Sequence, residues 1–166
     1  MGLQLTRRIW QHSGWNLTSS FYAVFSVGLI FVAMEEVSWG QWFVEFDTPS
    51  FLAEVNSQGE LNIHNIPVFN QLFEVLRVAF GVGGLFGVWL STQQQTAAIG
   101  APRVLSSWFV IITILAFLDL CNVFISPDNR PLALRFAASM VEVLELLIGL
   151  SAFLYMWLNK RVLFHK

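Results

Sequence analysis

The sequence predicts an all-α polytopic membrane protein, built as a four-helix transmembrane bundle. Of its 166 residues, 55% are hydrophobic and only 12% are charged, and the mean hydropathy is +0.61. Apolar runs recur at the length of about 20 residues that crosses a hydrocarbon layer of about 30 Å. The basic residues gather on one side of the predicted bundle. The length allows one such domain and leaves little for a separate soluble module.

The first predicted span covers about residues 17–34 and follows Arg7 and Arg8. Glu35 and Glu36 come directly after it, where a signal peptide would carry a small-residue cleavage site. We therefore expect this segment to be retained as a membrane helix.

Three further spans are predicted, separated by short turn-forming stretches that contain Gly100, Pro102 and the run SPDNRP. Short connections suit antiparallel neighbours in a bundle. The expected ranges are about 67–90, 104–125 and 132–158.

Glycines crowd the second predicted span at positions 81, 83, 84 and 87. Small residues allow the close backbone approach that drives helix association in lipid. Gly83 and Gly87 have the GxxxG spacing, and we expect them to pack within the chain rather than to form a dimer.

The distribution of Lys and Arg predicts the orientation. With four crossings, six basic residues fall on one side, whereas residues 35–66 on the other side contain none. The positive-inside rule then places both termini in the cytoplasm. The six are Arg7, Arg8, Arg103, Lys160, Arg161 and Lys166.

Two classes of function are excluded by composition. The net charge is −2 and no long basic run is present, so the sequence offers no nucleic-acid surface. Cys121 is the single cysteine, so neither an intramolecular disulfide nor a relay of paired thiols can form.

The first outer loop, residues 35–66, carries six acids and no Lys or Arg. Asp47 or Thr48 is expected to cap a short interfacial helix that begins at Pro49 and ends at Gly59. A loop of this length with structure of its own is more often functional than a plain tether.

Polar side chains follow within the same loop. If residues 60–64 are helical, Glu60 and His64 share a face; if they are extended, Glu60, Asn62 and His64 do. A carboxylate beside an imidazole suits proton transfer or metal binding. Glu36, Glu60 and His64 are therefore the candidate catalytic residues and the candidate ligands of a divalent cation. In the alternative, Asn65 caps the next helix and His64 has no chemical role.

Ionisable residues also lie inside the predicted spans, where a charge needs a partner or water. Glu74 and Arg77 are expected to pair at i, i+3, and Arg135 and Glu142 to bond a neighbouring helix. By depth, these groups fall in the outer half and would line one outward-opening cavity; alternatively, they form salt bridges that only hold the bundle together. The candidate ligand-binding residues are Glu35, Gln41, Asn62, Glu74, Arg77, Asp119, Arg135 and Glu142, with Glu145 beside them.

The string EEVSWGQ, followed by GELNIHN, resembles a pattern in multi-pass membrane proteins of bacteria. The resemblance covers residues 35–65. It carries no activity, ligand or protein partner, and it implies a bacterial inner membrane and a special role for this segment.

Two functions fit this pattern. In the first, an outward-facing polar site binds or transforms a lipid-linked or small amphiphilic molecule, with Arg77 and Arg135 as anion clamps and membrane lipids as partners. In the second, the chain is a non-catalytic accessory subunit that packs against partner membrane subunits. A proton or ion pathway is a third option and would require oligomerisation. The sequence contains no HExxH or GxSxG motif, so whether the chain is an enzyme stays open.

Overall fold

The computed structural model describes residues 1–164, apart from the side chains of Asn70 and Pro127, and every regular element in that range is helical. Four segments are long and apolar enough to cross a membrane. The predicted all-α fold with four such helices is therefore confirmed. The segments are α2 (Leu17–Glu36), α4 (Pro67–Leu90), Arg103–Phe124 around α5 (Ser106–Cys121), and α7 (Val141–Phe164).

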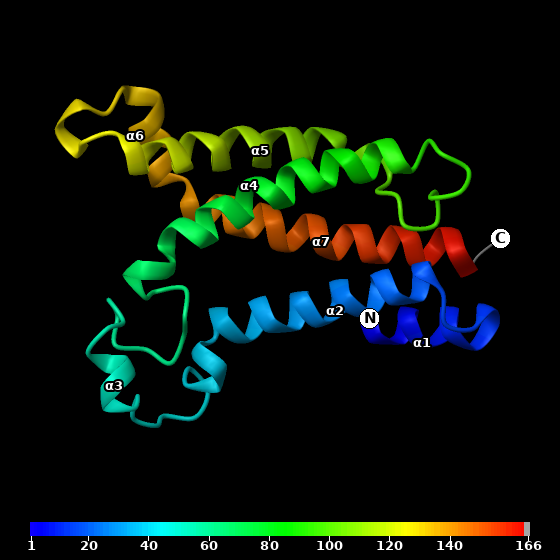
Figure 1. Cartoon of the computed structure of the whole chain (residues 1–166), viewed down its shortest axis with the longest axis horizontal. Coiled ribbons are helices and arrows are strands. Elements are labelled where there is room, and N and C mark those ends of the chain that lie inside the picture. The colour runs from blue at the N-terminus through cyan, green and yellow to red at the C-terminus, as the bar shows by residue number, and fades with distance from the viewer. Residues whose placement is uncertain (165–166) are drawn as a thin grey trace.

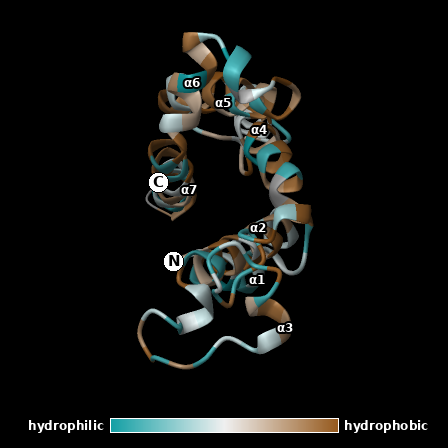
Figure 2. Ribbon diagram, turned by 90° about the vertical axis from the view of Figure 1, so that its left-hand side faces the viewer, coloured by the Kyte–Doolittle hydropathy of each residue, from teal (hydrophilic) through white to brown (hydrophobic). Residues whose placement is uncertain are grey.

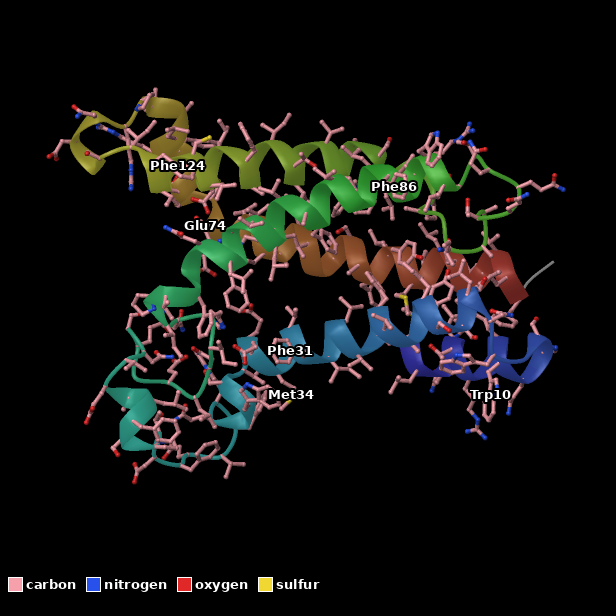
Figure 3. The ribbon with its side chains drawn as sticks, viewed as in Figure 1. Trp10, Phe31, Met34, Glu74, Phe86 and Phe124 are labelled. Atoms are coloured by element: carbon pink, nitrogen blue, oxygen red, sulfur yellow. The ribbon has the colours of Figure 1, made fainter. Side chains whose placement is uncertain are left out.

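The four long helices run roughly side by side (Figure 1), and seen along their length they form an arc in the order α2, α4, α5, α7 (Figure 2). We call the end where α2 and α5 finish the acidic end, since residues 37–66 extend from it. The opposite end, with the loop 91–102 and the last turn of α7, is the basic end. Aromatic side chains such as Trp10, Phe86 and Phe124 are exposed on the outer surface (Figure 3).

An N-terminal helix, α1 (Gly2–Ser13), was not expected from the sequence. It runs antiparallel to α2 and buries Leu5 and Ile9 (Figure 1). Gly2 packs so closely against Ser26 and Met156 that a β-carbon there would collide with both. Helix α1 therefore fills the angle between α2 and α7 in the basic half of the bundle.

The turn from α1 to α2 is set by local capping. Gly14 adopts φ 68°, which glycine tolerates without strain. The Asn16 side chain accepts a 3.0 Å hydrogen bond from the Ser19 amide, and the Ser19 hydroxyl accepts a 2.8 Å bond from the Asn16 amide. This reciprocal capping box starts α2.

Glycines form the seam between α4 and α5. A β-carbon on Gly81 would lie 2.5 Å from the Thr113 hydroxyl, and one on Gly84 would overlap the Phe109 ring. Gly83 has no atom within 4 Å of that position. Packing within the chain therefore uses the spacing of Gly81 and Gly84 and leaves Gly83 facing outward.

Hydrogen bonds fasten the loop 91–102 over the basic end. The Tyr22 and Tyr155 hydroxyls donate 2.8 Å bonds to the carbonyl oxygens of residues 98 and 99. The Asn159 amide donates to the carbonyl of residue 100 at 3.0 Å and to the Tyr22 hydroxyl at 2.9 Å. Tyr22 and Asn159 are both buried, so these polar groups tie α2, α7 and the loop together.

The fourth spanning helix starts later than expected. The range 132–158 is divided into α6 (Leu132–Ser139) and α7, with a break at Met140, where φ is −101° and ψ is 9°. The continuous apolar run concealed this break. Arg135 consequently lies on the short helix α6, outside the spanning helix.

The first loop contains a 3₁₀ turn, Ser38–Gly40, and one α-helical turn, α3 (Ser50–Ala53), which ends well before Gly59, where φ is 67°. The expected capping is wrong, since no side chain caps α3. The Thr48 hydroxyl instead accepts a 2.8 Å hydrogen bond from the Gln41 amide. Thr48 thus connects the loop to the segment that leaves α2.

Candidate functional site

The chain reverses direction sharply where α2 ends. After Glu36, Ser38 and Trp39 adopt φ 48° and 54°, and Gly40 adopts φ 96°. Side chains other than glycine rarely occupy this left-handed region, and each such residue costs about 1 kcal/mol or more. Helix α2 therefore ends at Glu36, and Ser38 and Gln41 do not continue its helical face.

The reversal folds the loop back onto Glu35. Its Oε1 accepts a 2.6 Å hydrogen bond from the Trp39 indole, and its Oε2 accepts bonds from the backbone amides of Ile63 at 2.7 Å and His64 at 3.2 Å. The His64 Nδ1 lies 3.6 Å from the same Oε2. Only 2% of Glu35 is exposed, and hydrogen bonds to a charged acceptor are among the strongest in proteins.

A second set of bonds joins Ser38 to the segment after Gly59. The Ser38 hydroxyl donates a 2.7 Å bond to Glu60 Oε2 and accepts a 3.1 Å bond from the Asn62 amide. Asn62 also donates to Glu60 Oε2 at 2.8 Å, and the buried Asn56 donates to Asn62 Oδ1 at 2.9 Å. The bonds of Ser38 hold the strained turn in place.

Gln41 completes the connection. Its carbonyl oxygen accepts a 3.0 Å bond from the Leu61 amide, and its amide donates to the Phe46 carbonyl at 2.9 Å. Beside it lies a hollow of about 480 Å³ lined by Gln41, Glu45, Phe46 and Asp47. The strings EEVSWGQ and GELNIHN thus interlock through side chains of both, and we call these five residues the loop network: Glu35, Ser38, Gln41, Glu60 and Asn62.

The local geometry of residues 60–64 matches neither expectation, because the segment forms neither a helix nor a regular strand. Glu60 bonds Asn62, while the carboxylate near His64 is Glu35. Asn65 does not cap α4, since its amide donates to Gln58 Oε1 at 3.0 Å. The carboxylate beside His64 is thus Glu35, 29 positions away in the sequence, rather than Glu60, four positions away.

Charged side chains meet where α4, α5 and α7 approach one another; Asp119 is buried, and Arg77 and Glu145 are partly buried. Arg77 on α4 lies 3.5 Å from Asp119 on α5 and 2.6 Å from Glu145 on α7. The expected pair with Glu74 is therefore replaced by two contacts to other helices. These ion pairs connect three spanning segments near the acidic end.

Glu74 lies on the same half of α4 (Figure 3) and interacts electrostatically with Asp119 and Arg77. Its Oε2 is buried, and none of the described side chains or backbone groups hydrogen-bonds to it. An isolated buried oxygen of this kind is costly, and Glu74 lacks the direct ion-pair contact with Arg77 that Asp119 has.

Glu36 links the loop to these charges. It interacts electrostatically with Glu145, Glu142, Arg77 and His64. Side chains from α2, the first loop, α4 and α7 therefore gather at the acidic end. We call this group the polar site; it comprises Glu36, His64, Glu74, Arg77, Asp119, Glu142 and Glu145.

Two sequence expectations fall outside the polar site. Arg135 is exposed on α6, where its Nε donates a 2.9 Å bond to the Arg130 carbonyl. Within the described residues, no three His, Cys, Asp or Glu side chains gather in a group that could hold a metal ion. The proposed metal ligands Glu36, Glu60 and His64 accordingly do not form one.

Several residues of the loop were missed as participants. The Trp39 indole donates to Glu35 Oε1, and the Trp42 indole donates to the Ser38 hydroxyl at 3.2 Å; neither was among the candidate site residues. Asn56 was not singled out at all. Gly40, which directly follows Ser38 and Trp39, was the one local indication of a left-handed turn.

The chain matches no protein-family model, no curated protein and no solved structure. Proposals about its activity therefore rest on the geometry of the loop network and the polar site.

Proposed function

We propose that this chain is a multi-pass protein of the bacterial inner membrane whose polar site binds a lipid-linked or small amphiphilic molecule. One observation carries the proposal: Glu36 and His64 come within electrostatic range of each other and of Arg77, although they belong to different segments. Charges inside a membrane bundle are costly and commonly mark ligand or ion sites. The site lies at the end of the spans, where a head group meets the protein.

The loop network supports a division of roles. Glu35 and Glu60 are engaged by hydrogen bonds from within the loop, so they serve as positioning residues. Glu35 in particular receives the His64 amide and lies beside its ring. If the molecule is transformed as well as bound, Glu36 and His64 are the groups placed to exchange a proton with it.

The charge of the site favours a cationic or hydrogen-bond-donating head group. Five carboxyl groups in the polar site face the Arg77 guanidinium and the His64 imidazole, and the Arg130 guanidinium also acts on Asp119 from outside it. Arg77 already contacts two carboxylates, and Arg135 lies on α6, so neither is available as an anion clamp. Opposite charge on the ligand would compensate the surplus carboxylates.

Binding of a fluorescent alkylamine and of the matching alkyl phosphate to the purified chain in mild detergent tests this proposal. The alkylamine should bind more tightly, and Glu36→Gln should weaken it about tenfold, the effect of one lost charged contact. Glu45→Gln is the matched control, because Glu45 carries the same charge in the same loop but lies outside the polar site.

Tighter binding of the alkyl phosphate would contradict the predicted head-group charge. Equal alkylamine affinity for the parent and Glu36→Gln would contradict the site itself. Far-ultraviolet circular dichroism of each variant separates lost binding from lost folding.

The proposed orientation places the termini and the basic end in the cytoplasm. It is supported by the basic residues of that end and by their absence from residues 35–66. In a Cys121→Ser background, a membrane-impermeant thiol reagent added to intact cells should label Glu45→Cys and spare Gln94→Cys. The reverse labelling pattern would overturn the orientation.

The alternative role as an accessory subunit is favoured by the surface of α4. In its most apolar stretch of 18 residues, only 6% of the residues are buried, and Gly83 faces open space. A partner helix could approach closely at that point. Mass measurement of the particle in mild detergent distinguishes a single chain with bound lipid from a complex with another subunit.

A further inference from the structure

A pocket of about 440 Å³ lies at the basic end, far from the polar site. It opens between α1, the start of α2, the loop 91–102 and the last turn of α7. Its lining residues are Ile9, His12, Ser13, Asn16, Thr18, Ala98, Leu163 and Phe164. No expectation from the sequence concerned this region.

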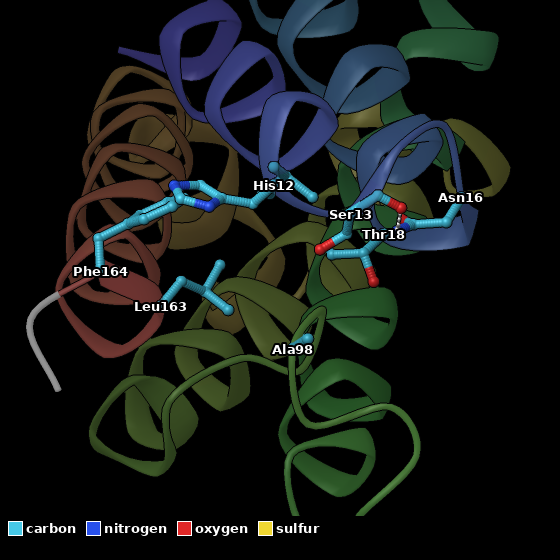
Figure 4. A pocket seen from close by; sticks show the side chains of 8 residues that line it. His12, Ser13, Asn16, Thr18, Ala98, Leu163 and Phe164 are labelled. Carbon is cyan, nitrogen blue, oxygen red and sulfur yellow. Dashed lines mark hydrogen bonds between the residues drawn. The ribbon is translucent and has the colours of Figure 1, made fainter.

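The pocket has a polar and an apolar side. Figure 4 shows Ser13, Asn16 and Thr18 on one side, with His12, Leu163 and Phe164 across from them. Hydroxyl and amide groups therefore face the same space as aliphatic and aromatic carbon. A ligand with both a polar head and an apolar body matches this lining.

Cationic and imidazole groups border the apolar side. The His12 ring centroid is 6.2 Å from that of Phe164, and the Arg8 Cζ lies 5.8 Å from the same Phe164 centroid. Phe164 thus places the Arg8 guanidinium beside the pocket through a cation–π contact. Arg8 and His12 both donate hydrogen bonds in the manner that suits phosphate oxygens.

Within the described residues that build the pocket, no Asp or Glu offsets these groups. All eleven acids of the chain lie between residues 35 and 145, and residues 75–118 contain none. The segments that build the pocket, 1–34, 91–102 and 146–164, consequently contain no Asp or Glu. Positive charge beside a partly apolar pocket, with no internal counter-charge, selects for an anionic ligand.

We propose that this pocket binds the phosphate-bearing head group of an anionic phospholipid. Arg8 and His12 would contact the phosphodiester, and the hydroxyls of Ser13 and Thr18 would donate to its oxygens. The acyl chains would lie against exposed apolar side chains of α1 and α7, such as Trp10 and Val162. Basic pockets between helices at the membrane boundary recognise such lipids.

The test uses the full chain in detergent, mixed with equal amounts of phosphatidylglycerol and phosphatidylcholine and examined by native mass spectrometry. The parent should retain phosphatidylglycerol in preference. Arg8→Ala should reduce that retention about tenfold, as expected for one lost charged hydrogen bond, and His12→Ala should also reduce it, because a hydrogen-bond donor is lost. Ala98→Phe should do the same by filling the pocket.

Arg103→Ala is the matched control, because it removes the same charge from the same end without changing the lining of the pocket. An equal loss in Arg103→Ala would overturn the proposal in favour of diffuse surface attraction. Equal retention of the two lipids would also overturn it.

Inorganic phosphate alone distinguishes the lipid from a free anion. If millimolar phosphate displaces phosphatidylglycerol completely, the recognition is of phosphate and not of a lipid, and the proposal fails. Glu36→Gln should leave phosphatidylglycerol retention unchanged, so this test and that of the polar site have independent outcomes.

Discussion

The Glu35 carboxylate and the Ile63 backbone amide are joined by a 2.7 Å hydrogen bond that spans 28 residues of sequence. The bond connects the end of α2 to the segment that leads into α4. A loop closed in this way is a folded element rather than a flexible tether. It also fixes His64, the next residue, relative to α2.

Glu35→Gln should destabilise the first loop. The new amide must direct its NH₂ group at one of the N–H donors that now bond the carboxylate, and the charge-assisted bonds are lost. The expected cost is about 2 kcal/mol, measured as a lower midpoint in denaturant titration and as faster protease cleavage within residues 40–60. Glu45→Gln should behave like the parent; identical cleavage of both variants would contradict the role of Glu35.

Arg77→Met should destabilise the bundle strongly. Asp119 and Glu145 would lose their shared cation while remaining inside the helical bundle, and breaking such pairs costs about 3 kcal/mol or more. Arg135→Met, on the exposed face of α6, should change stability by less than about 0.5 kcal/mol. Unfolding in mixed micelles with increasing sodium dodecyl sulfate measures the loss of stability in both variants. Equal losses in Arg77→Met and Arg135→Met would show that the ion pairs of Arg77 do not stabilise the bundle.

Gly84→Ala and Gly83→Ala form a matched pair on one helix. The Gly84 variant should be less stable by about 1 to 3 kcal/mol, because the added methyl meets the Phe109 ring. The Gly83 variant should be stabilised by up to about 1 kcal/mol, because alanine favours a helix and the space is open. Thermal unfolding in detergent gives the order, and the opposite order would contradict the α4–α5 seam.

Tyr22→Phe should loosen the loop at the basic end. It removes the donor to the residue 98 carbonyl and the acceptor for Asn159, at a cost of about 1 to 2 kcal/mol. Protease cleavage between residues 91 and 97 should become faster than in the parent. Gln94→Ala, an exposed change in the same loop, provides the control. Unchanged cleavage in Tyr22→Phe would argue against a role of Tyr22 in holding the loop 91–102 in place.

Hydropathy alone predicted the four long helices, because a run of apolar residues as long as a bilayer is thick is a strong pattern. Pro67 marked the start of α4 correctly, since proline suits the first turn of a helix. Helix α1 was missed because it has only twelve residues and mixed polarity. The break at Met140 was missed because neither proline nor glycine marks it.

Partners within the candidate site were harder to predict. The i, i+3 spacing predicted an ion pair between Glu74 and Arg77. Tertiary packing instead brings Asp119 and Glu145 into contact with Arg77. Likewise, periodicity paired Glu60 with His64, whereas the left-handed turn at Ser38 and Trp39 brought Glu35 there instead. Local spacing ranks neighbours along one element and contains no information about which distant segments fold over it.

The glycine seam also bears on the order of assembly. Helices α4 and α5 are consecutive and close-packed, so they can form a hairpin as soon as both are inserted. Helix α2 is made earlier, and its contacts with residues 60–64 can form before α4 is complete. The bond from Tyr22 to the residue 98 carbonyl, in contrast, exists only once α4 and the loop after it have been made. Helix α2 is therefore fastened in two steps, first at the acidic end and later at the basic end.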